Sequence, residues 1–207
     1  MIAAVIPAAG KSTRMGRPKL ALTLGGRTVL ERVIDALKAA AVDPVLVVLA
    51  PHVADLADIA RQAGAVVLVL ANETPDMRAT VEQGLSLLEG QYRPTSTDQW
   101  LLIPADHPTL DPAIIRELVK ARASHPEYSI VVPTYQGKRG HPTLIDWKHV
   151  AGLRELPPDR GINSYLRACQ AETLELAVAS GDVLLDLDTP EDYRRLQHEP
   201  PIGGGGS

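Results

Sequence analysis

Cationic side chains are concentrated at the start of this 207-residue chain. Residues 1–30 contain five of them and no Asp or Glu, although the whole chain carries a net charge of −4. Four of the five, Lys11, Arg14, Arg17 and Lys19, fall between positions 11 and 19 among glycine and proline residues. Like charges this close repel one another unless an anion sits among them. The segment is therefore a candidate anion-binding site, with a solvated basic turn as the alternative.

These cations belong to the loop PAAGKSTRMGRPKL, which follows the first strand-like run of the chain. In an open α/β sheet, ligands bind beyond the carboxyl ends of the strands. Ala8, Ala9 and Gly10 carry so little side chain that backbone N–H groups can approach a phosphate or a base closely. Arg14 and Lys19 could then reach the outer phosphates. The loop is predicted to bind a nucleotide.

Several common motifs are missing. A Walker A loop needs a glycine where Val5 stands, and no G-x-G-x-x-G is present, which argues against a P-loop NTPase and a dinucleotide fingerprint. The histidines and Cys169 lack zinc-ligand spacing, and no G-x-S-x-G elbow occurs.

A carboxylate follows a later strand-like run. In LLIPADHPTL, Asp106 lies just past the fourth predicted strand, at the same sheet edge as the cationic loop. Mg²⁺ prefers oxygen ligands, so Asp106 is a candidate metal ligand, with a turn or helix-start aspartate as the alternative. His107 is interpreted as structural, because magnesium sites seldom use imidazole.

Two further carboxylates occur in LLDLDTPED. If this segment is a strand, Asp186 and Asp188 lie on one face of it. Asp188 directly precedes a helix start, so its carboxylate could point into the same cleft. A capping or hairpin role accounts equally well for the pair.

Alternating strand and helix patterns surround these residues. Continuously apolar runs predict five strands covered on both faces, at 3–6, 45–49, 66–70, 100–103 and 129–132. Helical patterns with capping signals lie between them, at 28–41, 52–63, 76–88 and from Asp111-Pro112 onward. The chain is therefore predicted to be an α/β protein with a doubly wound, mostly parallel sheet and right-handed crossovers.

The second half departs from this alternation. Residues 133–145 predict a small β-hairpin inserted around a Gly-Lys-Arg-Gly turn, and 146–170 read as helix broken by Pro157-Pro158. Residues 173–178 and 183–188 are strand-like, and a last capped helix begins at Thr189. We expect one domain over 1–198 and a flexible tail over 199–207.

Composition excludes some classes of protein. With 45% hydrophobic and 22% charged residues, the chain can build a sizeable core, and no apolar run approaches the roughly 20 residues of a membrane-spanning helix. The first residues do not resemble a secretory signal, and one cysteine cannot form an internal disulfide, so we expect a cytoplasmic protein. Few aromatics and a negative net charge argue against nucleic acid as a partner.

The opening segment resembles the MobA-like NTP transferases. That family's signature corresponds here to Ala8-Ala9-Gly10, Arg14-Met15-Gly16 and Pro18-Lys19. The segments PADHPTL, GHPTLI and LDLDTPEDY agree with later family segments in the same order, so the resemblance spans about residues 2–196. The closest branch is the molybdopterin cytidylyltransferase-like group, although Pro7 replaces the leucine that is commoner there.

The resemblance implies roles for individual residues. It implies that Ala8, Ala9, Gly10 and the hydroxyl of Thr80 contact the nucleotide, and that Arg14 and Lys19 neutralise the triphosphate and act catalytically. It also implies that Asp106 and Asp188 bind Mg²⁺, with Asp106 catalytic, and that Gly140, His141 and Arg160 face the acceptor.

The implied reaction moves an NMP, with CMP favoured, from CTP or GTP to a phosphorylated acceptor such as molybdopterin, releasing pyrophosphate. The resemblance also raises docking to a molybdoenzyme or a chaperone. Two alternatives stay open: another acceptor (a sugar 1-phosphate, phospholactate or methylerythritol phosphate), and a non-catalytic nucleotide-binding module. The second alternative is disfavoured because such a module would usually have lost a metal-binding carboxylate or a phosphate-binding cation. This chain keeps all of its candidates for those roles, Asp106, Asp188, Arg14 and Lys19.

Overall fold

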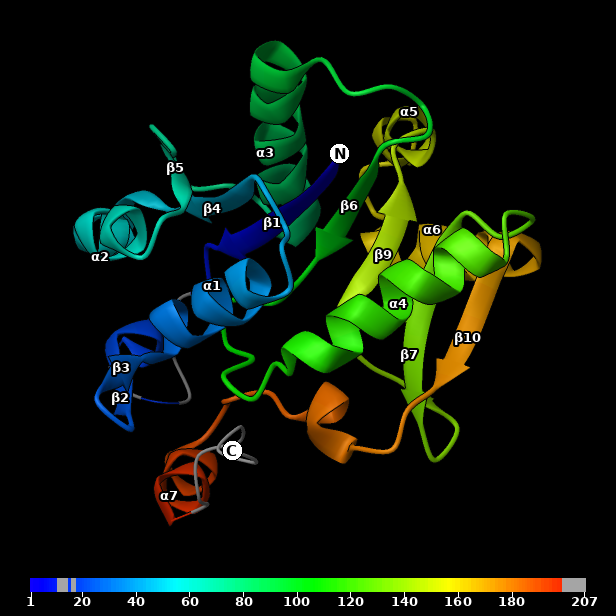
Figure 1. Ribbon diagram of the computed structural model, residues 1–207. Coiled ribbons are helices and arrows are strands. Elements are labelled where there is room, and N and C mark those ends of the chain that lie inside the picture. Colours follow the sequence, from blue (N-terminus) through cyan, green and yellow to red (C-terminus); the bar gives the residue numbers. More distant parts are fainter. Residues whose placement is uncertain (11–14, 16–17, 199–207) are drawn as a thin grey trace.

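A mostly parallel sheet forms the middle layer of the molecule (Figure 1). The computed structural model describes residues 1–10, 15 and 18–198. The sheet has eight strands in the order β10-β7-β9-β6-β1-β4-β5, and β8 pairs with β7. The strands are β1 (Ile2–Ala8), β4 (Val45–Leu49), β5 (Val66–Val69), β6 (Gln99–Leu102), β7 (Ile130–Tyr135), β8 (Lys138–Arg139), β9 (Thr143–Asp146) and β10 (Thr173–Ala177). The predicted doubly wound α/β class is confirmed.

Helices cover both faces of this sheet. One face packs against α1 (Val29–Ala39), α2 (Ala57–Gln62) and α4 (Pro112–Ser124). The other face packs against α3 (Met77–Tyr92), α5 (His149–Arg154) and α6 (Ile162–Ala168). The last helix, α7 (Pro190–His198), lies beyond the carboxyl ends of the strands (Figure 1). Within the described residues, none of the helices has the length and apolar character needed to cross a bilayer.

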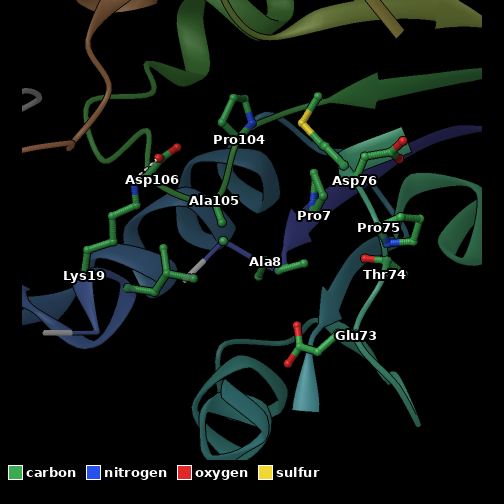
Figure 2. A pocket seen from close by; sticks show the side chains of 14 residues that line it. Pro7, Ala8, Lys19, Glu73, Thr74, Pro75, Asp76, Pro104, Ala105 and Asp106 are labelled. Carbon is green, nitrogen blue, oxygen red and sulfur yellow. Dashed lines mark hydrogen bonds and ion pairs between the residues drawn. The ribbon is translucent and has the colours of Figure 1, made fainter. Parts of the chain in front are cut away.

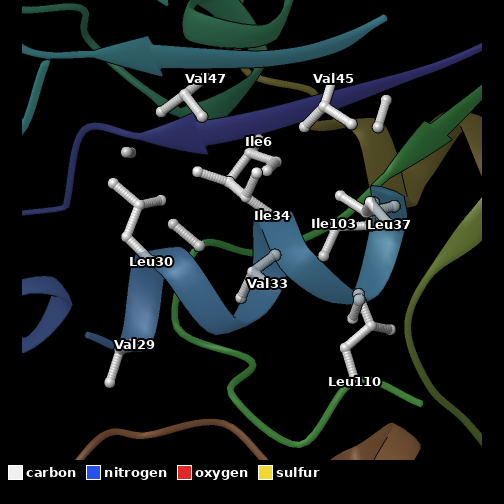
Figure 3. Close-up of a cluster of buried hydrophobic side chains, with 14 of the residues drawn as sticks. Ile6, Val29, Leu30, Val33, Ile34, Leu37, Val45, Val47, Ile103 and Leu110 are labelled. Atoms are coloured by element: carbon white, nitrogen blue, oxygen red, sulfur yellow. The ribbon is translucent and has the colours of Figure 1, made fainter. Parts of the chain in front are cut away.

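Strand alternation divides the core into two clusters. In β1, Ala4 and Ile6 face α1, whereas Val5 faces the opposite side together with Val48 of β4. Figure 3 shows Leu30, Ile34 and other side chains of α1 packed against Ile6 and its neighbours. The local signals for α1 are also correct, because Thr28 and Glu31 form the predicted capping box.

The predicted hairpin is present, but its turn lies earlier in the chain. Gln136 and Gly137 have positive φ angles of 49° and 75°, so they form the turn between β7 and β8. The predicted turn residues Lys138 and Arg139 are instead the short strand β8. The following strand, β9, enters the main sheet antiparallel to both β6 and β7.

Residues 183–188, predicted as a strand, are not one. The segment begins in a 3₁₀ turn, η4 (Gly181–Leu184), and continues without a strand partner. Its backbone groups bind loops instead: His141 N–H donates to Val183 O at 2.8 Å, and Leu187 N–H donates to Asp106 O at 2.9 Å. The segment therefore crosses the carboxyl ends of the strands rather than joining the sheet edge. Residues 199–207, the predicted tail, lie outside the described residues.

Gly84 allows α3 to approach the sheet closely. A Cβ at this position would lie 2.8 Å from Val48 Cγ2 and 3.2 Å from Val5 Cγ1, both on buried branched side chains. We expect Gly84→Ala to lower the free energy of unfolding by about 1–2 kcal/mol, because overpacking outweighs the gain of about 1 kcal/mol in helix propensity.

Gly90, on the same helix, is the matched control. A Cβ there meets no atom of the described residues within 4 Å, so Gly90→Ala should keep the propensity gain and stabilise the protein. Urea unfolding of both variants checks the prediction, and destabilisation of equal size in the two would contradict it.

A buried histidine lies at the amino-terminal end of β7, far from the strand ends that carry the carboxylates. His149 Nε2 lies 2.7 Å from Ser129 Oγ, and Nδ1 lies 2.9 Å from the Tyr165 hydroxyl. Burial lowers the pKa of His149, and the nearby Glu172 carboxylate offsets this only in part.

The lowered pKa of His149 predicts a pH-dependent stability. As the pH falls through the ordinary histidine value of about 6.5, the unfolded chain binds a proton that the folded chain does not. The free energy of unfolding should therefore decrease between pH 7.5 and 5.5. In His149→Gln this pH dependence should be weaker. Urea unfolding at three pH values measures it, and a free energy of unfolding that changed equally with pH in the variant and the wild type would refute the prediction.

Candidate functional site

A cavity of about 530 Å³ opens where β1 and β6 end and α3 begins (Figure 2). β1 and β6 are parallel neighbours, with Val5 opposite Leu102, so the loops that follow them emerge side by side. The end of β1 and the loop after it line the cavity with Ala8, Ala9 and Gly10, and the loop after β6 lines it with residues 104–106. The predicted small-residue loop and the predicted carboxylate therefore share one cavity.

Three charged side chains from distant parts of the chain meet beside this cavity: Lys19 and Asp106 line it, and Asp188, which is not among the described lining residues, contacts Lys19. Lys19 Nζ donates to Asp106, whose carboxylate faces it in Figure 2. The same ammonium donates to Asp188 Oδ1 at 3.0 Å. Lys19 and Asp106 are largely buried, whereas Asp188 is 39% exposed. The structure thus brings Lys19, Asp106 and Asp188 together, although 169 positions separate the first from the last.

Lys19 is held by a short turn anchored in the core. It begins the 3₁₀ turn η1 (Lys19–Ala21), in which Leu20 is buried. The chain then forms the hairpin β2 (Thr23–Leu24) and β3 (Arg27–Thr28), turning at two glycines with positive φ. Tyr193 of α7 donates its hydroxyl to Thr23 O at 2.8 Å. The C-terminal helix therefore braces the segment that carries Lys19.

Asp188 is placed by the start of α7. Thr189 and Asp192 form the predicted capping pair: Thr189 N–H donates to Asp192 Oδ2 at 2.9 Å, and Asp192 N–H donates to Thr189 Oγ1 at 3.2 Å. Asp192 also accepts from the backbone N–H of Asp188 at 3.3 Å. One residue before Asp188, Leu187 is fully buried and binds the backbone of Asp106. Both carboxylates are therefore positioned by the same two segments.

The two carboxylates keep Lys19 charged. Burial opposes the charge on this side chain, but hydrogen bonds and attraction from Asp106 and Asp188 outweigh burial and raise the pKa of Lys19 above its ordinary value. An ammonium between two carboxylates shows that this position favours a cation.

Asp106 and Asp188 fit a divalent metal on the same grounds. Mg²⁺ is commonly held by one or two carboxylates, with waters and substrate phosphates as the other ligands. Within the described part of the chain, no cluster of three or more His, Cys, Asp or Glu side chains offers a fuller set of ligands. A metal here would therefore depend on oxygens from the substrate.

The third wall of the cavity was only partly anticipated. It consists of residues 73–77, which lead from β5 into α3. Asp76 caps α3 by accepting from Ala79 N–H at 2.8 Å. Thr80, whose hydroxyl was predicted to contact the nucleotide, is fully buried behind this wall. Its hydroxyl shares a 2.5 Å hydrogen bond with that of Thr74, which does line the cavity. Thr80 would therefore act on a ligand through Thr74. The rule that ligands bind beyond strand ends could have indicated residues 73–76, because they follow β5.

His52 joins two walls of the cavity and was not predicted. Its Nδ1 lies 2.7 Å from Glu73 Oε1, and its Nε2 lies 3.4 Å from the carbonyl oxygen of Gly10. The histidine therefore ties the loop after β1 to the loop after β5.

The predicted acceptor residues are not among the described residues that line the cavity. Gly140 packs against Val183, whose carbonyl oxygen would lie 2.4 Å from a Cβ at this position. His141 follows it, with its ring centroid 6.3 Å from that of His107. Arg160 is exposed on the loop between α5 and α6. Their acceptor roles stay predictions, and Arg14 lies outside the described residues.

His107 is buried beside the carboxylate pair. Its Nδ1 lies 3.4 Å from Asp186 Oδ1, and this contact holds the pKa of Asp186 below its ordinary value despite burial. The two predicted aspartates of the 183–188 segment therefore contact different partners, Asp186 the imidazole and Asp188 the ammonium.

Comparison with known proteins decides the family. The family model described as the MobA-like NTP transferase domain matches residues 4–174. The chain belongs to the MobA-like NTP transferase family. This MobA-like chain is 27% identical over 213 aligned residues to the molybdenum cofactor guanylyltransferase of Rhizobium meliloti (strain 1021), covering 94% of this chain and 89% of that protein.

Solved structures share the fold of this chain. The crystal structure of Rv0371c from Mycobacterium tuberculosis H37Rv matches 96% of this MobA-like chain and 97% of its own, with 28% identity and a TM-score of 0.74. A structure of the same mycobacterial protein in complex with manganese matches with 27% identity and a TM-score of 0.72, covering 96% of this chain and 98% of that one. The protein is therefore a nucleotidyltransferase by family, with the doubly wound, mostly parallel α/β architecture predicted from its sequence.

Proposed function

We propose that this protein transfers an NMP from an NTP to a phosphorylated small-molecule acceptor and releases pyrophosphate, in a reaction that needs a divalent metal. The observation that carries this proposal is that Lys19 contacts both Asp106 and Asp188, and that Lys19 and Asp106 line the same cavity as Ala8, Ala9 and Gly10. A cation and two carboxylates beside a small-residue loop suit a polyanion together with a metal ion.

The chain's own residues supply position and charge. The small side chains of residues 8–10 let the nucleotide approach the backbone, and the 73–77 wall faces it from the other side. Lys19 is charged and largely buried, so its attraction to a phosphate is only weakly screened by water. Arg14 is proposed to assist it. Mg²⁺ held by Asp106 and Asp188 would neutralise phosphate charge.

The transfer requires little proton chemistry from the protein. An acceptor phosphate monoester has a second pKa of about 6, so it is mostly dianionic at neutral pH. One of its oxygens forms a bond to the α-phosphorus of the NTP, and the bond from that phosphorus to the pyrophosphate oxygen breaks. Pyrophosphate leaves with added negative charge, which Lys19 is positioned to stabilise.

Molybdopterin is the acceptor we favour. The resemblance of the opening segment indicates the cytidylyltransferase branch and hence CTP. The relative from Rhizobium meliloti is described as a guanylyltransferase of the molybdenum cofactor, which supports the same acceptor and makes GTP a second candidate.

A pyrophosphate-release assay tests the proposal. CTP, GTP, ATP and UTP are each incubated with the protein and Mg²⁺, with molybdopterin, a sugar 1-phosphate, methylerythritol phosphate or no acceptor. We expect release that depends on molybdopterin, on Mg²⁺ and on CTP or GTP. Release with a different acceptor would reassign the substrate, and no acceptor-dependent release with any combination would overturn the proposed function.

A further inference from the structure

Two side chains, His107 and Asp186, connect the segment that carries Asp106 to the segment that carries Asp188. His107 follows Asp106 directly, and Asp186 precedes Asp188 by two residues. His107 Nδ1 faces Asp186 Oδ1 at 3.4 Å, across a separation of 79 residues in the chain. The contact therefore connects the loop that carries Asp106 to the segment that carries Asp188.

Backbone contacts fix the register of these segments. Leu187 N–H donates to Asp106 O at 2.9 Å, and the Leu187 side chain is fully buried. Farther along, Thr109 Oγ1 donates to Asp182 O at 3.5 Å. Segment 182–188 pairs with no strand among the described residues, so contacts with loops hold its position.

His107 is suited to set the orientation of this segment. Its side chain is 1% exposed, so its ring has little freedom to move. Among the described residues its Nε2 has no hydrogen-bond partner. Its Nδ1 contacts the Asp186 carboxylate, so this contact is the hydrogen bond that orients the ring within the described part of the chain. A buried polar group that is aimed at a carboxylate restricts that carboxylate and the backbone carrying it.

We propose that His107 is a positioning residue that, by holding Asp186, sets the separation of Asp106 and Asp188 and thereby the affinity of the site for a divalent cation. This inference rests on the proposed function, in which those two carboxylates bind the metal. The expected effect is of the kind seen when side chains behind metal ligands are replaced, where affinity changes about 10- to 100-fold.

Binding of Mn²⁺ to the full chain tests the proposal without measuring turnover. Bound Mn²⁺ is followed by electron paramagnetic resonance, in the presence of a non-hydrolysable CTP or GTP analogue, for the wild type and for His107→Leu, His107→Asn and His107→Gln. An asparagine amide places its N–H near the position of Nδ1, whereas a glutamine amide places it near Nε2. We expect His107→Leu and His107→Gln to weaken Mn²⁺ binding about 10-fold. His107→Asn should retain most of the wild-type affinity.

Thr109→Val is the matched control. It removes a side-chain hydrogen bond between the same two segments, away from Asp106 and Asp188, so Mn²⁺ affinity should stay close to that of the wild type. If His107→Leu does not fold, Asp186→Ala removes the same contact from the more exposed partner and should give the same loss of affinity.

The outcomes separate the two proposals. Wild-type Mn²⁺ binding together with wild-type affinity in folded His107→Leu or Asp186→Ala would overturn the positioning role alone. Equal losses in His107→Asn and His107→Gln, or a comparable loss in Thr109→Val, would also overturn it, because they would show general loosening. A wild-type protein that binds no Mn²⁺ with either analogue would overturn both proposals.

Discussion

Replacing Lys19 by alanine is expected to lower kcat/KM for pyrophosphate release at least about 100-fold, or about 2.7 kcal/mol of transition-state stabilisation. Its ammonium is charged, largely buried and placed at the cavity between two carboxylates. Without it, the leaving pyrophosphate loses a cation that is poorly screened by water, and Asp106 and Asp188 repel each other.

Arg27→Ala is the control for this prediction. Arg27 is another cation of the basic N-terminal segment, but it is exposed and pairs with Glu31 and Asp35. Exposed ion pairs contribute little, typically about 0–1 kcal/mol, so kcat/KM should change little. A Lys19→Ala protein that remains folded by circular dichroism and releases pyrophosphate at near-wild-type rates would contradict the role of Lys19.

Replacing Asp106 by asparagine should cause a loss of similar size, at least about 100-fold in kcat/KM. The amide keeps the shape of the carboxylate and can still accept from Lys19, but it lacks the charge that favours a divalent cation. A second consequence distinguishes this variant from Lys19→Ala: the concentration of Mg²⁺ that gives half-maximal activity should rise.

Asp43→Asn provides the comparison. Asp43 also pairs with a lysine, because Lys38 Nζ lies 2.9 Å from its carboxylate, but this pair is on the surface. Losing that charge should leave both kcat/KM and the Mg²⁺ requirement unchanged. Unaltered activity and Mg²⁺ dependence in Asp106→Asn would remove Asp106 from the metal site.

Local sequence signals correctly predicted the elements whose boundaries depend on residues only a few positions away in the chain. Thr28 with Glu31 and Thr189 with Asp192 are capping pairs three residues apart, and both helices begin where these pairs predict. The continuously apolar runs form strands as predicted, and they are apolar throughout because helices bury both faces of the sheet. In contrast, residues 183–188 have a strand-like pattern, but their backbone partners, near Asp106 and His141, are distant in the chain.

The candidate site shows the same division. Ala8, Gly10 and Asp106 were predicted together because the ends of parallel strands lie at one edge of the sheet. The loop 73–76 carries no unusual charge or motif, so its contribution to the cavity depends on where β5 ends. The contact of Lys19 with Asp188 depends on how the segment before α7 returns across the strand ends, which no local pattern specifies.

The position of Lys19 has a thermodynamic consequence. Its ammonium acts as a tethered counterion, so a divalent ion bound as we propose would have to compete with it for Asp106 and Asp188. A triphosphate that attracts Lys19 relieves that competition, and reciprocity requires that the ion then strengthen triphosphate binding by the same factor. The two substances should therefore load cooperatively, and the unliganded enzyme should bind stray divalent ions only weakly.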